Sequence, residues 1–506
     1  MTIDVIPSQR LSHKKISLFS ATALNIGCMV GSGWLFSAQL AAHYAGNWSF
    51  LAILLAGMMA ILIGICFASV AVAYPIVGVV TRSSSISHNE IFGMPFATAN
   101  WLGILVAVST EAQATGQYLF GVFRTPLLMM DGIVTPYGKM IEVGILIIYL
   151  MINFYGIRAL ARINNMVMVL KLFTPILVGT ILLVAHFDSR NFDLGSVNNG
   201  IYSYKSIIAA LVSAGLVYSL NGFQAVIAFA GEIENPKKNV IKTVIISITL
   251  VTVLYMLLEL AFMGAVPHAY VMSHGWAHLN FASPLVDLTM LLGLHFLAIL
   301  LTADSVISPS GTGYSYLGAT ARMLHAMAKE GQVPRWIARV APGALFSKRA
   351  VLLNFVLATL FLINSSGWAI LMVLVTGCNI IGYMAAPISM GALKPHTRIF
   401  GGVVFVLITL VMTTVPRHDI IIIASAMTLL MGSYLLLHFG RDALKKIVTL
   451  VLPFLIYLWS FYLVPNRGYA IVIALVFYIL VTDRRYVVYC SKFRKKMTFD
   501  EMNNET

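Results

Sequence analysis

Cys28-Met29-Val30-Gly31-Ser32-Gly33-Trp34 lies inside an apolar run that covers residues 19–42. A glycine in a helix interior costs roughly 1 kcal/mol relative to alanine, so this stretch predicts an interruption of the helix. Unwound backbone in the middle of a membrane is tolerated only where it lines a cavity or is buried in protein. Such a break frees backbone N–H groups and the positive end of a half-helix, which suit an anion such as a carboxylate. The glycines alone are equally consistent with close packing of two unbroken helices.

The composition is that of a membrane protein. Of the 506 residues, 59% are hydrophobic and only 10% are charged. A bilayer core takes about 20 apolar residues per helix. Such runs recur almost to the C-terminus, which predicts an all-α polytopic membrane protein. We expect about fourteen transmembrane helices, centred near residues 30, 61, 108, 148, 177, 217, 253, 298, 357, 378, 408, 427, 456 and 475. Sharp helix ends are predicted at Tyr74-Pro75, Asn235-Pro236 and Ser365-Ser366-Gly367.

The positive charges predict the orientation. If the N-terminus is cytoplasmic, most of the 33 Lys and Arg residues fall in inner segments, as the positive-inside rule requires. Both termini are then cytoplasmic, and the protein is expected in the cell (cytoplasmic) membrane. This topology and contact with anionic membrane lipid account for the net charge of +14, so no nucleic-acid partner is needed to explain it.

A second interruption is predicted in the sixth span. The run is Ala214-Gly215-Leu216-Val217-Tyr218-Ser219-Leu220-Asn221-Gly222-Phe223-Gln224, which mixes glycine and polar residues within one helical stretch. Spans 1 and 6 are five apart, so each would begin one half of a repeat. Two interrupted segments at corresponding positions indicate a transporter binding site between inverted repeats. The alternative is a polar helix that packs through side-chain hydrogen bonds.

Three motifs carry a resemblance to a known family. They are residues 26–36 (IGCMVGSGWLF), 221–239 (NGFQAVIAFAGEIENPKKN) and 321–334 (ARMLHAMAKEGQVP). In order and spacing they resemble the amino acid–polyamine–organocation (APC) transporters, over residues 12–394. The resemblance implies the leucine-transporter-like fold, a 5+5 inverted repeat with broken helices 1 and 6. The count of fourteen spans is similar to the subgroup that contains bacterial aspartate–proton symporters.

The resemblance also implies a division of the chain and a binding site. Residues 1–18 are expected to form a cytoplasmic N-terminus, 19–395 the transport core, 396–482 the accessory spans 11–14, and 483–506 a cytoplasmic tail. Backbone N–H groups of the first break would hold a substrate carboxylate, and carbonyls of the second would receive its ammonium group. The implied substrate-binding residues are Val30, Gly31, Ser32, Gly33, Tyr218, Ser219, Leu220, Asn221 and Gly222. Tyr218 is equally explained as a packing aromatic.

Three ionisable residues within the spans are candidates for proton coupling, since such residues are functional hypotheses by default. Lys171 lies in span 5, where several APC members carry a lysine in place of the ion of sodium-driven relatives. Glu111 in span 3 and Asp304 in span 8 occupy corresponding positions of the repeat. The alternatives are a lysine that reaches to the membrane surface and carboxylates with a structural role. Gln224 stands where some members have a proton-responsive glutamate, so that mechanism does not carry over.

These observations predict a secondary active amino acid transporter that works by alternating access, with proton-coupled symport. An amino acid exchanger and a non-transporting membrane sensor remain the alternatives. An enzyme is disfavoured because the sequence has no nucleophile–base pair, metal cluster or phosphate-binding loop. No cofactor or metal is expected; the partners are a small-molecule amino acid, protons and membrane lipid.

Overall fold

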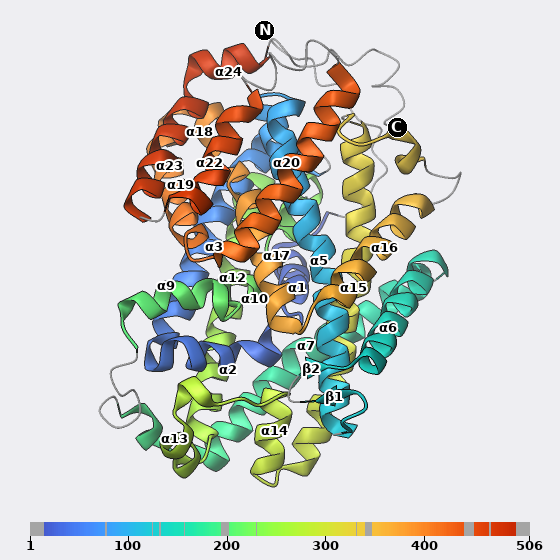
Figure 1. Ribbon diagram of the computed structural model, residues 1–506, viewed down its shortest axis with the longest axis vertical. Coiled ribbons are helices and arrows are strands. Elements are labelled where there is room, and N and C mark those ends of the chain that lie inside the picture. The colour runs from blue at the N-terminus through green and yellow to red at the C-terminus, as the bar shows by residue number, and fades with distance from the viewer. Residues whose placement is uncertain are drawn as a thin grey trace.

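The computed structural model is a helical molecule, elongated along one axis (Figure 1). It describes residues 15–75, 78–123, 125–130, 133–155, 157–193, 202–228, 230–329, 331–339, 347–439, 450–464 and 467–491. Residues 1–14 and 492–506, which belong to the two expected cytoplasmic termini, lie outside the described residues. Strands β1 (Met129–Met130) and β2 (Ile133–Val134) pair antiparallel in a short hairpin. Figure 1 shows this hairpin in the lower half of the view and α24 (Arg484–Ser491) at the top.

The helices are as follows. In the first half they are α1 (Leu18–Met29), α2 (Gly33–Ala45), α3 (Ser49–Ala73), α4 (Val79–Ser87), α5 (Glu90–Phe123), α6 (Pro136–Tyr155), α7 (Ile157–His186), α9 (Tyr204–Ser213), α10 (Leu216–Ser219), α11 (Ala225–Ala228) and α12 (Pro236–Ala265). In the second half they are α13 (His268–His274), α14 (Pro284–Leu291), α15 (His295–Lys329), α16 (Lys348–Asn364), α17 (Trp368–Tyr383), α18 (Ala385–Leu393), α19 (Arg398–Met412), α20 (Arg417–Phe439), α22 (Leu452–Leu463), α23 (Arg467–Thr482) and α24. Short 3-10 turns are η1 (Gly46–Trp48), η2 (Ser189–Phe192), η3 (Ala230–Glu232), η4 (Trp276–His278), η5 (Arg335–Ala338) and η6 (Pro395–Thr397).

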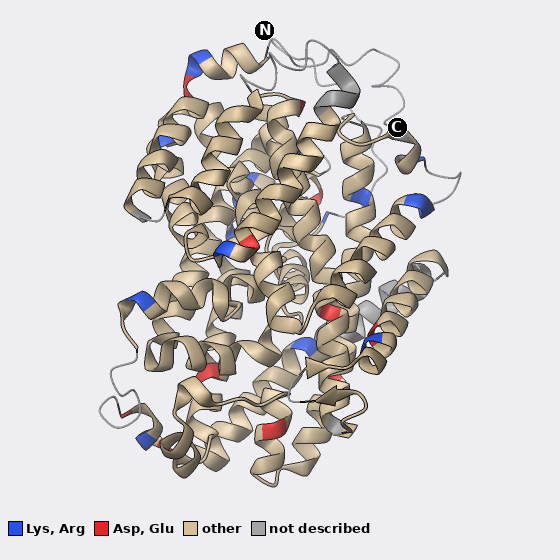
Figure 2. Cartoon of the chain, in the orientation of Figure 1, with Lys and Arg blue, Asp and Glu red and all other residues tan. Residues whose placement is uncertain are grey.

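The chain is a multi-pass membrane protein. Six apolar helical segments of the described chain are long enough to cross a membrane. They are Gly33–Ala73, Glu90–Gly121, Pro136–Phe154, Pro236–Ala265, Trp368–Leu393 and Pro395–Met412. Charged residues are sparse over the body of the molecule (Figure 2). All fourteen expected span centres lie in helices or, for residue 30, at the junction of α1 and α2. The number of membrane crossings stays a prediction, because several of these helices are short.

The predicted sharp helix ends are confirmed. Helix α3 ends at Ala73, just before Tyr74-Pro75. Helix α12 begins with Pro236, whose fixed backbone angle suits the first helical position. The preceding Asn235 has a φ of 47° and turns the chain sharply into α12. Helices α16 and α17 are separated by Ser365-Ser366-Gly367. Local sequence therefore sets these boundaries.

The buried side chains form two clusters. One joins α5, α6, α15 and α16 through residues that include Leu105, Leu146, Leu317 and Ala358. The larger cluster contains the inner faces of α1, α2, α3, α12 and α17, and it continues through α18 into α19, α22 and α23. Helices of the expected accessory segment thus pack directly on the rest of the molecule.

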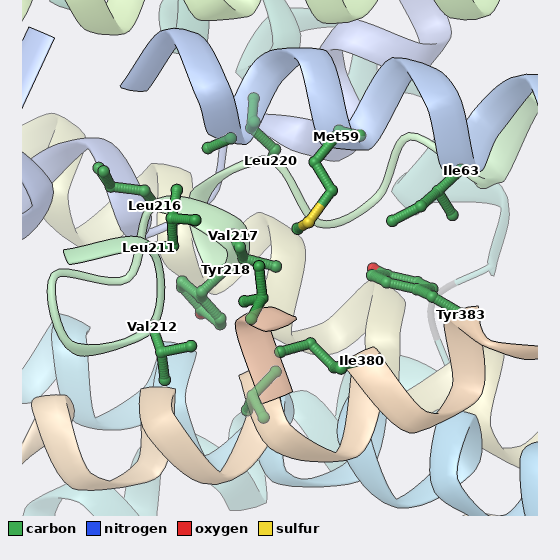
Figure 3. Packing of buried hydrophobic residues seen from close by; sticks show 14 of the residues in the cluster. Met59, Ile63, Leu211, Val212, Leu216, Val217, Tyr218, Leu220, Ile380 and Tyr383 are labelled. Atoms are coloured by element: carbon green, nitrogen blue, oxygen red, sulfur yellow. The ribbon is translucent and has the colours of Figure 1, made fainter. Parts of the chain in front are cut away.

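Both predicted interruptions are present. The first break, residues 30–32, separates α1 from α2. The second break, residues 214–224, contains the single turn α10 between α9 and α11. Gly215 and Gly222 have φ values of 71° and 103°, which are available to glycine but rarely to other residues. Figure 3 shows Leu216, Val217 and Leu220 of the second break packed between α3 and α17.

The two breaks lie against each other. A Cβ on Gly33 would lie 2.8 Å from the Cα of Ser219, and a Cβ on Gly222 would lie 2.3 Å from the Cys28 carbonyl oxygen. These separations are shorter than a Cβ tolerates, so only glycine allows the backbones to approach this closely. Glycine at these positions therefore allows both the helix interruptions and the close contact between them.

This contact predicts that a side chain at Gly222 lowers the stability of the fold, whereas a side chain at an uncrowded glycine does not. In Gly222→Ala, the positive φ alone should cost about 1–2 kcal/mol, and the clash with the Cys28 carbonyl adds to it. The midpoint of thermal unfolding of the purified protein should fall by several degrees. Gly144→Ala is the matched control, because its Cβ meets nothing within 4 Å. Equal midpoints for the two variants would contradict the interlocked geometry.

Candidate functional site

Of the three backbone N–H groups of the first break, residues 30–32, two donate within their own segment and one donates to another helix. The Val30 N–H donates to the Ile26 carbonyl at 3.0 Å, and the Gly31 N–H donates to the Met29 carbonyl at 3.1 Å. The Ser32 N–H instead donates to Oε2 of Glu111 at 2.9 Å. Ser32 is fully buried. A backbone N–H at the start of α2 therefore meets a carboxylate, as the charge distribution of a helix start favours.

Glu111 ties the two breaks together. It lies on α5, its side chain is 2% exposed, and its Oε1 accepts a hydrogen bond from the Tyr218 hydroxyl at 2.8 Å. The absence of a side chain at Gly31 leaves room for this carboxylate, since a Cβ there would lie 2.7 Å from Oε1. The backbone that was expected to hold a substrate carboxylate thus binds a carboxylate of the chain itself.

An aromatic layer covers Ser32. The Trp368 Nε1 donates to Ser32 Oγ at 3.0 Å, and this oxygen also lies 3.1 Å from the Tyr218 hydroxyl. The Trp368 ring stacks on Phe36 with centroids 4.4 Å apart and meets the edge of Tyr218 at 5.6 Å. Tyr118 packs edge-on against Phe36 and donates to the Leu35 carbonyl at 2.6 Å. These residues, which we call the aromatic layer, belong to α2, α5, α10 and α17.

Lys171 lies on the other side of the first break. Its side chain is 4% exposed. Its Nζ donates to Thr312 Oγ1 of α15 at 2.6 Å and to the Gly27 carbonyl of α1 at 3.4 Å. This inward geometry is not that of a lysine that reaches to the membrane surface. Beside it is a cavity of about 50 Å³, whose lining includes Gly27, Cys28, Lys171, Thr312, Ser315 and Tyr316.

Asp304 is separate from the breaks. It lies on α15, its side chain is 2% exposed, and its two oxygens accept no hydrogen bond within the described part of the chain. It is attracted electrostatically to Lys171, which also attracts Glu111. Of the three candidates for proton coupling, Glu111 and Asp304 therefore both interact with Lys171, and Glu111 is the carboxylate that contacts the breaks.

The second break has its carbonyl groups partly engaged. The Ser219 carbonyl accepts from the Tyr255 hydroxyl at 2.8 Å, and the Tyr218 carbonyl accepts from the Asn221 N–H at 2.8 Å. A carbonyl oxygen has two lone pairs, so each can accept one more hydrogen bond. The Asn221 Oδ1 accepts from Tyr383 at 2.9 Å and from Gln224 at 3.1 Å. Gln224 thus supports the break through an amide rather than a charge.

Sequence reasoning missed several residues of this site. Trp368, Tyr255, Tyr383 and Thr312 all contact the breaks or Lys171 through side-chain hydrogen bonds. In the sequence they are ordinary members of apolar spans, and neither charge nor periodicity marks them. The one available signal was the position of Trp368 directly after Ser365-Ser366-Gly367.

The hydrogen bond from Tyr218 to Glu111 predicts a stability effect. In Tyr218→Phe, a buried carboxylate loses one of its donors, which should destabilise the protein by about 1–3 kcal/mol. A thermal unfolding midpoint measured in detergent should fall accordingly. Tyr314→Phe is the control, because the buried Tyr314 hydroxyl has no hydrogen-bond partner in the described residues. If both variants unfold like the parent, the hydroxyl does not hold the carboxylate.

Comparison with known proteins gives a consistent result. The family model described as amino acid permease matches residues 16–483. The glutamate/serine transporter AimA of Bacillus subtilis (strain 168) is 31% identical over 389 residues, which cover 76% of this chain and 71% of the relative. The aspartate-proton symporter of the same organism is 28% identical over 390 residues, which cover 76% and 74%. Its methylthioribose transporter is 24% identical over 350 residues, which cover 67% and 73%. These relatives are transporters and not enzymes. The resemblance seen in the three motifs is confirmed, and the chain belongs to the amino acid permease family of APC transporters.

Proposed function

We propose that this protein is a secondary active amino acid transporter that works by alternating access as a proton-coupled symporter. The observation that carries the proposal is the contact of the two breaks at Ser32, where a backbone N–H binds a carboxylate inside the membrane protein. Amino acid transport itself agrees with the family and with the relatives. The symport mechanism and the roles of individual residues are the proposal.

The substrate carboxylate would bind the backbone around Val30, Gly31, Ser32 and Gly33. Its ammonium group would bind the carbonyls of Tyr218, Ser219 and Leu220, beside Asn221 and Gly222. Backbone groups suit this task because every α-amino acid presents the same carboxylate and ammonium. The relatives named for glutamate, serine and aspartate favour an acidic or small polar amino acid as the substrate.

Two contacts on opposite sides of the first break would act as gates. The aromatic layer follows the break, around Phe36 and Trp368. Before the break, the Ile16 N–H donates to the Glu232 carbonyl at 2.9 Å, and the Glu234 N–H donates to the Ile16 carbonyl at 3.0 Å. This short pairing joins the residues just before α1 to the segment between α11 and α12. Alternating access requires that one contact opens while the other stays closed.

Lys171 would couple the proton to the gates. Lys171, on α7, donates hydrogen bonds to Gly27 of α1 and Thr312 of α15. A change in its charge would therefore alter the strength of its hydrogen bond to α1. Glu111 and Asp304 are the carboxylates that interact electrostatically with Lys171. An aspartate-proton symporter among the relatives supports coupling to protons.

The proposed topology is the one expected from the sequence. It has fourteen spans and a 5+5 inverted repeat in residues 19–395, with accessory spans in 396–482. The segments 1–18 and 483–506 are cytoplasmic. The joint cluster of α5, α6, α15 and α16 supports the repeat, because these helices correspond to spans 3, 4, 8 and 9, each pair five apart. The cell membrane is the proposed location.

Uptake into liposomes tests the function. Purified protein should accumulate labelled glutamate, aspartate or serine when an inward proton gradient is applied, and the gradient should raise the plateau several-fold. Lys171→Ala should abolish the effect of the gradient, because the linking cation is lost. Lys205→Ala, at an exposed position on α9, is the control and should behave like the parent.

The alternatives give different results. Uptake that requires preloaded amino acid and ignores the gradient would identify an exchanger. Binding without uptake would identify a sensor. If Lys171→Ala keeps full dependence on the gradient, Lys171 has no part in coupling.

A further inference from the structure

We propose that Glu111 is an internal competitor of the substrate: its carboxylate occupies the donor that the substrate carboxylate needs, so that substrate binding displaces it and adds a proton to it. This inference rests on the proposed function and deepens it, because it assigns one step of coupling to one side chain. The evidence for it is the pair of hydrogen bonds that the Glu111 carboxylate accepts, one from each break.

The competition between Glu111 and a substrate carboxylate follows from the hydrogen-bond donors of the two breaks. Val30 and Gly31 of the first break donate to carbonyl groups, whereas the Ser32 N–H donates to a carboxylate oxygen, Oε2 of Glu111. The second oxygen of Glu111 is held by Tyr218, which belongs to the other break. One carboxylate thus bridges the two elements that a zwitterionic amino acid would bridge. One N–H bond has one hydrogen, so it cannot serve two carboxylates well at once.

The small volume of the neighbouring cavity also favours competition between Glu111 and the substrate carboxylate. The nearby cavity beside Lys171, of about 50 Å³, has room for one or two water molecules. An amino acid therefore requires movement of a side chain at the break. Glu111 is held by hydrogen bonds from Ser32 and Tyr218, whereas Trp368 and Tyr118 are held by ring contacts as well as by hydrogen bonds. Rotation of the Glu111 side chain is therefore the movement that we expect.

Electrostatics supplies the link to protons. The titratable side chains that interact with Glu111 are Tyr149 on α6, Lys171 on α7, Tyr218 on α10, Tyr255 on α12 and Tyr316 on α15. Cys28 and Asp304 interact with Lys171 in turn. Among these groups Lys171 is the cation, and it can balance one carboxylate. A second ionised carboxylate in the same buried space is strongly disfavoured.

Substrate binding is coupled to the uptake of one proton at Glu111. The substrate arrives with its α-carboxylate ionised and its α-amino group protonated, and the α-carboxylate takes the Ser32 N–H; a side-chain carboxylate of glutamate or aspartate takes no part in this step. Glu111 leaves this donor and binds one proton from the aqueous side, so the site gains one amino acid and one proton. The protonated Glu111 can then donate through its own O–H, which compensates for the lost hydrogen bond. Release of the substrate lets Glu111 ionise and return to Ser32, which resets the site.

Proton uptake on binding is the direct test. Calorimetric titration of the purified protein with glutamate, aspartate and serine, in buffers of different ionisation enthalpy, counts the protons bound with the substrate. The parent protein should take up about one proton, and its affinity should weaken by about tenfold for each pH unit above the titration of Glu111. Glu111→Gln should bind with no proton uptake and with an affinity that does not change with pH.

Two further variants keep the test decisive. Glu259→Gln changes another fully buried carboxylate, on α12, and should behave like the parent. Glu111→Asp keeps the charge but shortens the side chain, so its carboxylate withdraws from Ser32; its affinity at high pH should exceed that of the parent. If Glu111→Gln does not fold, this variant carries the test.

The outcomes separate the two proposals. If the parent binds none of the amino acids, the proposed function fails. If the parent binds with proton uptake and Glu111→Gln keeps that uptake, the competitor role is overturned while the transporter survives. A folded Glu111→Gln that no longer binds substrate would also overturn it, because Glu111 would then be a contact that substrate requires.

Discussion

The hydrogen bond from the Ser32 N–H to Glu111 is the interaction on which the rest of the site depends. It exists because the helix is broken: in a continuous helix this N–H would be used by the carbonyl one turn earlier. Inside a membrane protein an unsatisfied N–H is costly, so a break must have an internal partner. Glu111 is that partner, and its carboxylate brings charge into the region where α1, α2 and α10 meet. The same donor that stabilises the resting arrangement is therefore the donor that a substrate carboxylate would use.

The close contact of the two breaks connects the Ser32–Glu111 hydrogen bond to the rest of the site. Gly33 against Ser219 and Gly222 against Cys28 bring the backbones of the two breaks into direct contact. Tyr218 and Trp368 connect Ser32 to the aromatic layer, and Lys171 connects α1 to α7 and α15. A change at Glu111 can thus reach one proposed gate through Trp368 and the other through α1. This is a chain of physical contacts; the alternating movement along it belongs to the proposed function.

The sequence predicted the breaks but not the partners that satisfy them. Gly31-Ser32-Gly33 and the polar run around Asn221 are visible because glycine and amide residues are unusual in apolar spans. The pairing of Ser32 with Glu111 joins residues 79 apart, and it depends on how α5 packs on the break, which local sequence does not encode. Glu111 was selected for its charge within a span and for its place in the expected repeat, facing the broken helices, but its hydrogen bond to Ser32 was not predicted. Trp368, Tyr255 and Tyr383 were missed because an aromatic residue in an apolar helix is usually a packing residue.

A structure of the protein with a bound amino acid, determined by cryo-electron microscopy in lipid nanodiscs, tests the central claim most directly. The account predicts that the substrate carboxylate lies within hydrogen-bonding distance of the Ser32 N–H and that the Glu111 carboxylate has moved away from it. A complex in which Glu111 still accepts from Ser32, with the amino acid bound elsewhere, would contradict the account.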